Sequence, residues 1–310
     1  MADVTNYTFI AAETFLDETH RTPIDIAKND RDDIVCASNK IKGHNVVIAV
    51  SLSGEYKPDS AAVVAQGTLS RFPNIRIGLL VGVGGGSRYS RHGIQLGDVV
   101  VGSHGVFQFG LRKSLQGEDS SLEQPVSLNQ PPVAIRSAVS ILDLEYKQDD
   151  YRLHWKIKRA LGGWPYLQDY ARPPSHRTTG DDHHSALPRE QAHLVKLAER
   201  DSSKIHHGRI ASSNRIMNNA TAGAFPGDLC FETEAAGLTD RFPCLLLRGI
   251  CDYSDASKHK GWERFAAVAA AAYAADLLRS IKPQTIETEK PILGILGQSQ
   301  YISPSSNGTI

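Results

Sequence analysis

The segment RIGLLVGVGGG, residues 76–86, limits the possible folds more than any other part of the chain. Residues 76–83 carry apolar side chains on both faces of an extended strand, which is typical of a strand covered by helices on both sides. Glycine then dominates the sequence, at Gly82, Gly84, Gly85 and Gly86. We therefore expect a central strand of an α/β sheet that leads into a glycine-rich turn.

Strand and helix patterns alternate along the rest of the chain. Apolar, β-branched runs predict strands at 44–52, 98–103, 206–213 and 242–252. Helical spacing predicts helices at 59–72, 131–146, 188–201 and 261–280, and turn-forming residues predict a long loop over 160–185. This order predicts one α/β domain over residues 5–280, a three-layer sandwich whose mixed central β-sheet is flanked by helices. Residues 281–310 are expected to form a flexible C-terminal tail.

Composition excludes several classes of function. Lys and Arg total 34 and Asp and Glu total 34, so no global field attracts nucleic acid or an anionic membrane. The longest apolar stretch, 265–275, is about half as long as a membrane span, and the N-terminal residues show no signal-peptide pattern. The cysteines lack a C-x-x-C spacing, which predicts reduced thiols and a cytoplasmic location: Cys36, Cys230, Cys244 and Cys251.

The glycine run does not match the common phosphate-binding motifs. A Walker A loop needs Lys followed by Ser or Thr, whereas Ser87 and Arg88 follow here. A dinucleotide fingerprint needs a helix after the glycines, and this sequence predicts another strand. Two interpretations stay open: close approach of the backbone to a ligand, or a glycine-rich hairpin without one.

Two further segments carry charged residues in apolar surroundings. In DLCFETEAAGL, residues 228–238, Glu232 and Glu234 lie on one face if the segment is extended. In CLLLRGICDYSD, residues 244–255, an apolar strand places Arg248 and Asp252 near its carboxyl end, where ligands collect in open α/β sheets. The alternatives are a solvated strand edge or the N-terminal turn of a helix for the first segment, and a structural Arg–Asp ion pair for the second.

Taken together, these motifs resemble the purine and uridine phosphorylase superfamily. The resemblance rests on the strand with glycines, then E-x-E-A-A, then R-G-x-x-D-Y-S-D and an alanine-rich last helix, and it covers roughly residues 5–280. The nearest branch looks like the nucleoside phosphorylase domains of fungi, relatives of methylthioadenosine/adenosylhomocysteine nucleosidase. Further segments fit that branch: 43–56, 71–86, 95–103, 127–132 and 206–214.

The resemblance implies cleavage of the N-glycosidic bond of a purine nucleoside, without a cofactor. Asp252 resembles the general acid that protonates the base, and Arg248 resembles the arginine beside the nucleophile. Glu234 resembles the carboxylate that binds the ribose hydroxyls, with Glu232 as the first acid of the same motif. The segment YTFIAAETFLDE aligns with the family's first strand and turn, which places Glu18 where nucleosidases keep a water-binding glutamate; Glu13 takes this position if the register slips.

The same resemblance implies which residues line the pocket. Thr233 stands where the family usually has a methionine against the sugar, which makes the pocket more polar or wider. The remaining positions would lie beside the sugar and the base: Val83, Gly84, Gly85, Asn214 and Ile216. The family also forms oligomers, so we expect a homo-oligomer, with a dimer favoured.

Hydrolysis is favoured over phosphorolysis, which is the alternative. Bacterial-type phosphorylases have an arginine and a serine beside the glycines, where this chain has Leu80 and Val83. The N-terminal turn offers the acids Glu13, Asp17 and Glu18, which repel phosphate and suit activation of water.

Other functions remain open from the sequence. The chain could sense a nucleoside without cleaving it, or cleave nucleotides with arginines at the pocket rim: Arg88, Arg91, Arg209 and Arg215. A metal-dependent hydrolase is the third alternative, with ligands drawn from segment 175–184: His176, Asp181, Asp182, His183 and His184.

Overall fold

The computed structural model describes residues 4–17, 34–51, 58–87, 93–103, 106–108, 126–127, 131–165, 167, 202–212, 228–235, 238, 242–253 and 261–299. Its helices are α1 (Val4–Glu13), α2 (Pro58–Arg71), α3 (Val133–Gln148), α4 (Arg152–Leu161), α6 (Trp262–Ser280), α7 (Pro283–Glu287) and α8 (Ile292–Ser299). Its strands are β1 (Ile34–Ile41), β2 (His44–Ser51), β3 (Gly78–Gly86), β4 (Val99–Val101), β5 (Val106–Gln108), β6 (Val126–Ser127), β7 (Ile205–His207), β8 (Arg209–Ser212), β9 (Asp228–Glu232) and β10 (Cys244–Asp252).

Within the described residues, eight strands form one mixed sheet in the order β6-β5-β8-β9-β3-β10-β4-β7, and β1 and β2 form a separate antiparallel pair. β3 lies near the middle, parallel to β10 on one side and antiparallel to β9 on the other. The long apolar strands thus take the central positions, as their sequences predicted.

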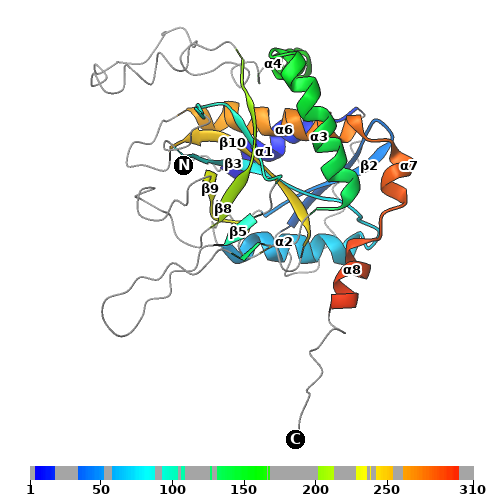
Figure 1. The fold of residues 1–310 in the computed structure, drawn as a ribbon. Helices are drawn as coiled ribbons and strands as arrows, with labels where there is room; N and C mark the ends of the chain where they lie inside the picture. The colour runs from blue at the N-terminus through cyan, green and yellow to red at the C-terminus, as the bar shows by residue number, and fades with distance from the viewer. Residues whose placement is uncertain are drawn as a thin grey trace, which may run out of the picture.

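Helices cover both faces of this sheet. α1, α3, α4 and α6 pack on the face that includes Leu245 and Leu247 of β10. α2 lies on the opposite face, where Ala61 and Ala65 pack against a cluster that includes Leu246 and Ile250. Figure 1 shows α2 along one side of the sheet and α6 along the other. The predicted three-layer α/β sandwich is confirmed.

α6 approaches β10 unusually closely because both elements have small residues at the contact. A Cβ atom on Gly249 would lie 1.9 Å from the carbonyl oxygen of Ala266. The alanine run 269–272 is almost fully buried against the sheet and its neighbouring helices. Alanine has the highest intrinsic helix propensity, so this segment is a stable helix that still permits close packing.

The structure differs from the sequence prediction in several segments. The strand predicted at 206–213 is two strands, β7 and β8, at separate positions in the sheet. Residues 283–299 form α7 and α8, and Ile292 is fully buried with its N–H donating to the carbonyl of Ile75. The expected irregular tail is therefore wrong for this stretch, and residues 300–310 lie outside the described residues. The glycines from Gly82 to Gly86 belong to β3 itself, so the strand does not end in a turn at Gly82. The helix predicted at 188–201 lies outside the described residues.

Candidate active site

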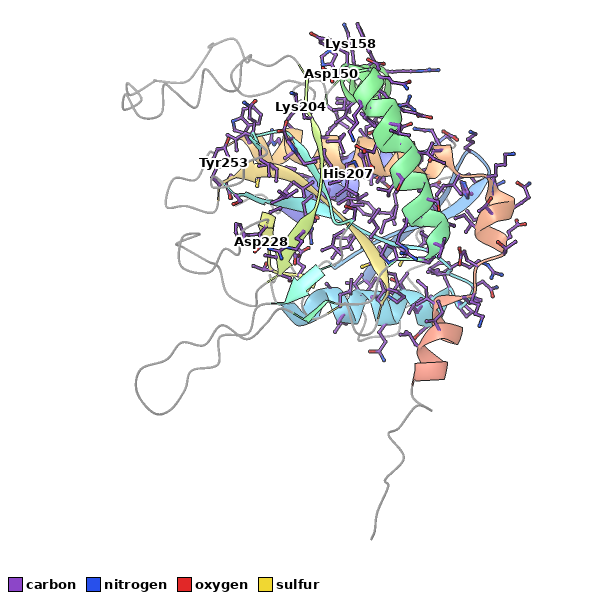
Figure 2. All side chains as sticks on the ribbon, in the orientation of Figure 1. Asp150, Lys158, Lys204, His207, Asp228 and Tyr253 are labelled. Carbon is purple, nitrogen blue, oxygen red and sulfur yellow. The ribbon has the colours of Figure 1, made fainter. Side chains whose placement is uncertain are left out.

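Three neighbouring strands bring together the charged residues that the sequence singled out. Arg248 of β10 is opposite Gly82 of β3, and Asp252 is opposite Gly85. β9 pairs with the other edge of β3 at Gly85 and Gly86, and it ends at Glu232. Two labels in Figure 2 help to locate these strands: Tyr253 follows directly after β10, and Asp228 is the first residue of β9. The E-x-E and R-G-x-x-D motifs thus meet across β3.

Arg248 and the two glutamates form a compact ion cluster. The Nη2 atom of Arg248 donates to Oε2 of Glu232 at 2.6 Å and to Oε2 of Glu234 at 3.1 Å. The side chains of Arg248 and Glu232 are only 1% and 2% exposed, whereas that of Glu234 is 34% exposed. Glu232 is therefore the buried anchor of the cluster, and Glu234 is the carboxylate that reaches the surface of the site.

Glu232 also fixes the backbone that carries Glu234. Its carboxylate accepts the N–H groups of Glu234 at 2.9 Å and of Ala235 at 3.0 Å. One buried side chain thus orders the turn after β9 and orients Arg248 at the same time. The spacing of the two glutamates gave no sign of this division between them, because only burial separates their environments.

Gly82 gives the Arg248 side chain its route to Glu232. Arg248 and Gly82 are paired residues on neighbouring strands, and Glu232 lies on the strand beyond. A Cβ atom on Gly82 would lie 2.0 Å from Nη1 of Arg248. The guanidinium therefore crosses β3 over this glycine. At Gly84, a Cβ would meet Cys230 Sγ at 2.6 Å and the carbonyl oxygen of Phe231 at 2.9 Å. Close approach of protein groups accounts for both glycines.

The electrostatics of the cluster keep Arg248 charged. Burial disfavours its charged form, but the carboxylates of Glu232 and Glu234 outweigh this effect and raise the pKa of Arg248 above its ordinary value. One guanidinium and two carboxylates leave a net negative charge. The Nε atom of Arg248 is buried and finds no acceptor among the described residues.

Asp252 lies at the carboxyl end of β10, next to the glycines of β3. The pairing shifts between Ile250, opposite Gly84, and Asp252, opposite Gly85, so Cys251 is an extra residue in β10. Such bulges change the direction in which a strand presents its next side chain. Asp252 is partly buried, and its Oδ2 atom lies 3.9 Å from Sγ of Cys251. It is therefore close to the glycine segment that contains Val83, Gly84 and Gly85.

A cavity of about 750 Å³ reaches the cluster at Glu234 and extends along the sheet away from it, and neither Arg248 nor Asp252 belongs to its lining. Thr233 and Glu234 contribute to its lining, together with residues of β2, α2 and the first half of β3. Its volume is within the range of small-molecule sites in proteins.

The N-terminal acids lie elsewhere or outside the described residues. Residues 4–13 form α1, not the family's first strand, so that alignment is wrong. Tyr7 contacts Arg264 in the first turn of α6, whereas Phe15 and Asp17 accept from Arg279 in its last turn. α1 therefore runs parallel to α6, and Glu13 lies near the end of α6 that is remote from the carboxyl end of β10. Burial raises the pKa of Glu13. Glu18 is outside the described residues, as are Asn214 and Ile216.

Of the candidate rim arginines and metal ligands, the structure describes only Arg209. Arg209 forms an ion pair with the buried Asp228 at 2.9 Å, so it is not a free rim arginine. Arg88, Arg91, Arg215 and the whole segment 175–184 lie outside the described residues. Among those that are described, no group of three or more His, Cys, Asp and Glu is placed to hold a metal ion. None of the described helices is both long enough and apolar enough to cross a membrane.

Comparison with solved structures places this arrangement in a known fold. A methylthioadenosine/S-adenosylhomocysteine nucleosidase from Helicobacter pylori, an aspartate-to-asparagine variant with 5'-methylthioadenosine in its active site, has a TM-score of 0.53 at 11% identity. The alignment covers 91% of this chain and 96% of that one. The same enzyme with butyl-thio-DADMe-Immucillin-A has a TM-score of 0.52 at 11% identity, over 91% and 95% of the two chains. The chain shares the fold of these nucleosidases, as the motifs predicted.

Sequence comparison adds one longer relative. A nucleotide-binding leucine-rich repeat (NLR)-like protein from Hyaloscypha variabilis is 32% identical over 305 aligned residues, which cover 90% of this chain. The chain spans 29% of the length of that relative. No protein-family model matches the chain. The assignment to the fungal branch stays a prediction.

Proposed function

We propose that the chain is a purine nucleosidase, which hydrolyses the N-glycosidic bond to release free base and ribose. The observation that carries the proposal is the buried Arg248, bound by Glu232 and Glu234 across β3, with Asp252 four residues further along the same strand. In this proposal the base binds beside the carboxyl group of Asp252 and the pentose binds at the carboxylate of Glu234.

Glu234 is the proposed ligand of the ribose hydroxyls. Its partly exposed carboxylate is held by Arg248, so it is oriented before the substrate binds. Two vicinal hydroxyls donate well to one carboxylate. Its negative charge also stabilises the oxocarbenium ion that develops on the pentose as the bond breaks. Thr233 lines the cavity of about 750 Å³ together with Glu234, and it would contact the sugar.

Asp252 is the proposed general acid. As the bond between C1' and the base nitrogen breaks, its electron pair passes to the base, and protonated Asp252 transfers its proton to N7. A water oxygen then adds to C1', and one of its protons ultimately restores Asp252. The base would lie against Val83, Gly84 and Gly85, beside the carboxyl end of β10.

The charge of the cluster favours water over phosphate as the nucleophile. A phosphorylase needs cationic donors that are available to phosphate. Here the guanidinium of Arg248 is already shared by two carboxylates and is 1% exposed. Leu80 and Val83 add no polar donor from β3. Asn214 and Ile216 stay proposed neighbours of the base, whereas the water-binding role of Glu18 is withdrawn, because it rested on the N-terminal alignment that α1 contradicts. The homo-oligomer and the cytoplasmic location also stay predictions.

The test measures free base and sugar released by the full chain from adenosine, inosine, guanosine, 5'-methylthioadenosine and ATP, with and without phosphate. We expect base and ribose from a purine nucleoside at a rate independent of phosphate. Asp252→Asn should lower this rate about 10²–10⁴-fold without loss of the fold. Asp150→Asn, an exposed change between α3 and α4 (Figure 2), is the matched control and should retain the full rate. Full activity of Asp252→Asn would rule out the assigned acid, and ribose 1-phosphate as product would identify a phosphorylase.

The NLR-like relative favours a second candidate function. A chain that spans 29% of the length of an NLR-like protein can bind a nucleoside or nucleotide as a sensor without cleaving it. Saturable binding of adenosine or ATP by calorimetry, with no base released over many hours, would support this candidate. Cleavage of ATP in preference to adenosine would instead support a nucleotide nucleosidase.

A further inference from the structure

The outer side of α3 exposes large apolar side chains to water. On its inner side, Ile135 and Tyr146 are buried in the core. On its outer side, Val133, Ile141 and Leu144 are 63%, 58% and 60% exposed. A helix with one face in the core normally has polar and charged residues on the opposite face. The pattern of α3 is therefore typical of a helix that is covered on both sides.

These side chains gather on one part of the molecule. Of the seven large hydrophobic residues that are exposed in the described part of the chain, five fall within residues 133–155. Figure 1 shows α3 and α4, in green, one after the other along one side of the molecule. Exposed apolar residues that lie together are typical of protein–protein contacts. We call this surface the outer face, and its residues are Val133, Ile141, Leu144, Tyr151 and Trp155.

Two charged residues at the ends of α3 oppose the dipole of the helix. Arg136 lies in the first turn, where the dipole favours an acid, and Asp149 follows the last residue, where the dipole favours a base. Oδ1 of Asp149 accepts the N–H of Tyr151 at 3.0 Å, whereas its Oδ2 has no partner among the described residues. A negative charge brought to Arg136 and a positive charge brought to Asp149 would therefore stabilise both ends of the helix.

We propose that the outer face binds a second copy of the chain, with the two α3 helices antiparallel about a two-fold axis between Ile141 and Leu144. In a two-fold contact, the residue that meets a given partner residue is met by it in return. Ile141 of each copy then lies opposite Leu144 of the other. Arg136 and Asp149 are equally far from the axis along the helix, about 10 Å at a rise of 1.5 Å per residue. Each Arg136 therefore comes opposite Asp149 of the other copy.

The residues between these positions permit close contact of the two helices. Ser137 and Ser140 are exposed, and their spacing places them on the same side of α3 as Leu144. Their small side chains let the helix axes approach to the distance of about 8–10 Å at which helices pack. A parallel pair would instead bring each Arg136 against its own copy and away from Asp149. The order of the charges therefore favours the antiparallel pair.

Sedimentation equilibrium of the full chain, without a nucleoside, measures the contact directly. Over about a hundredfold range of concentration we expect a species of twice the chain mass of 33.8 kDa, which dissociates on dilution. Leu144→Asp places a carboxylate opposite Ile141 twice in each dimer and should raise the dissociation constant at least about thirtyfold. Val63→Asp makes a similar change on α2, at a residue that is 59% exposed, and should leave it unchanged. Circular dichroism verifies that both variants fold.

Charge reversal tests the antiparallel arrangement. Arg136→Glu places an acid opposite Asp149 of the other copy, and Asp149→Arg places a base opposite Arg136. Each variant alone should associate at least about tenfold more weakly than the unmodified chain. An equimolar mixture of the two should recover most of the affinity, because both contacts across the axis then join opposite charges. A local effect of losing the contact between Asp149 and Tyr151 would persist in the mixture, so recovery reports the contact between copies.

Three results would overturn the proposal: a monomer at every concentration, equal weakening by Leu144→Asp and Val63→Asp, and a mixture that associates no better than either charge variant alone. The second result would place the contact on another face, and the third would exclude the antiparallel pair. The outcome is independent of the proposed nucleosidase activity, because these measurements contain no nucleoside.

Discussion

The two faces of β10 bury side chains in different ways. Toward α6, Leu245 and Leu247 pack in an apolar cluster and Gly249 admits the backbone of α6. On the other face, Leu246 and Ile250 flank Arg248, whose charge is compensated by two carboxylates. One face is therefore stabilised by close packing alone, and the other depends on ion pairs inside an apolar frame. A largely apolar strand can therefore hold a buried cation. This requires a glycine beside it on the neighbouring strand, which leaves room for the side chain, and a carboxylate that compensates its charge.

The largest effect is expected from removing the buried cation. Arg248→Met leaves Glu232 buried without its counter-charge, so the free energy of unfolding should fall by about 3–5 kcal/mol. Urea denaturation followed by circular dichroism measures this change. Adding Glu232→Leu to Arg248→Met should restore part of the loss, because the uncompensated carboxylate is then gone.

A matched surface pair provides the control for that experiment. Arg279 donates to Asp17 at 2.7 Å, but these side chains are 31% and 41% exposed. Arg279→Met should cost less than about 1 kcal/mol. If Arg248→Met lowered the free energy of unfolding no more than Arg279→Met does, the face of β10 that carries Arg248 would not depend on charge compensation.

The glycines on the two faces should respond differently to a methyl group. Gly249→Ala meets the backbone of α6, which has little room to move, and should cost about 3 kcal/mol or prevent folding. Gly82→Ala meets the guanidinium of Arg248, which can shift at the expense of its ion pair, and should cost about 1–2 kcal/mol. Urea denaturation of each variant gives the comparison.

A double-mutant cycle sharpens this difference. The effect of Gly82→Ala should shrink by at least about 0.5 kcal/mol in an Arg248→Met background, since the two residues are in contact. The effect of Gly249→Ala should not depend on Arg248. Equal coupling at both glycines would contradict the separation of the two faces.

The smallest effect concerns thiol reactivity and leaves stability unchanged. Burial raises the pKa of Cys244 to about 12, despite the opposing charge of Arg248, and it also raises the pKa of Cys230 and Cys251. At pH 8 a thiol with a pKa near 12 is ionised in roughly one molecule in ten thousand, and the thiolate is the reactive form. Ellman's reagent should therefore modify the partly exposed Cys36 rapidly and the other three only after unfolding.

This labelling experiment also compares the faces, because Cys251 packs beside α6 whereas Cys230 and Cys244 lie on the opposite face. Rapid modification of Cys230 and Cys244 alone would show that the face with the ion cluster opens in solution.

The sequence by itself determined the central elements and the identity of the site motifs. Apolar runs predicted β2, β3 and β10, and helical spacing predicted α2, α3 and α6, because hydrophobicity and its periodicity are properties of short segments. The E-x-E and R-G-x-x-D motifs named Glu232, Glu234, Arg248 and Asp252, and the fold brings the first three into contact. The helices α7 and α8 were not predicted, because both segments are short and the sequence from Pro283 onward is rich in Pro, Gln, Ser, Asn and Gly.

Tertiary structure alone decided what each of these residues does in the fold. The glycines looked like a ligand-binding turn, but Gly82 admits an arginine from the next strand, a contact between residues far apart in the sequence. Burial distinguishes Glu232 from Glu234, although their sequence context is nearly the same. The N-terminal segment became a helix against α6, so Glu13 lies far from Asp252. Local pattern fixes which segments are strands and helices, whereas the pairing of distant side chains depends on how the strands are ordered.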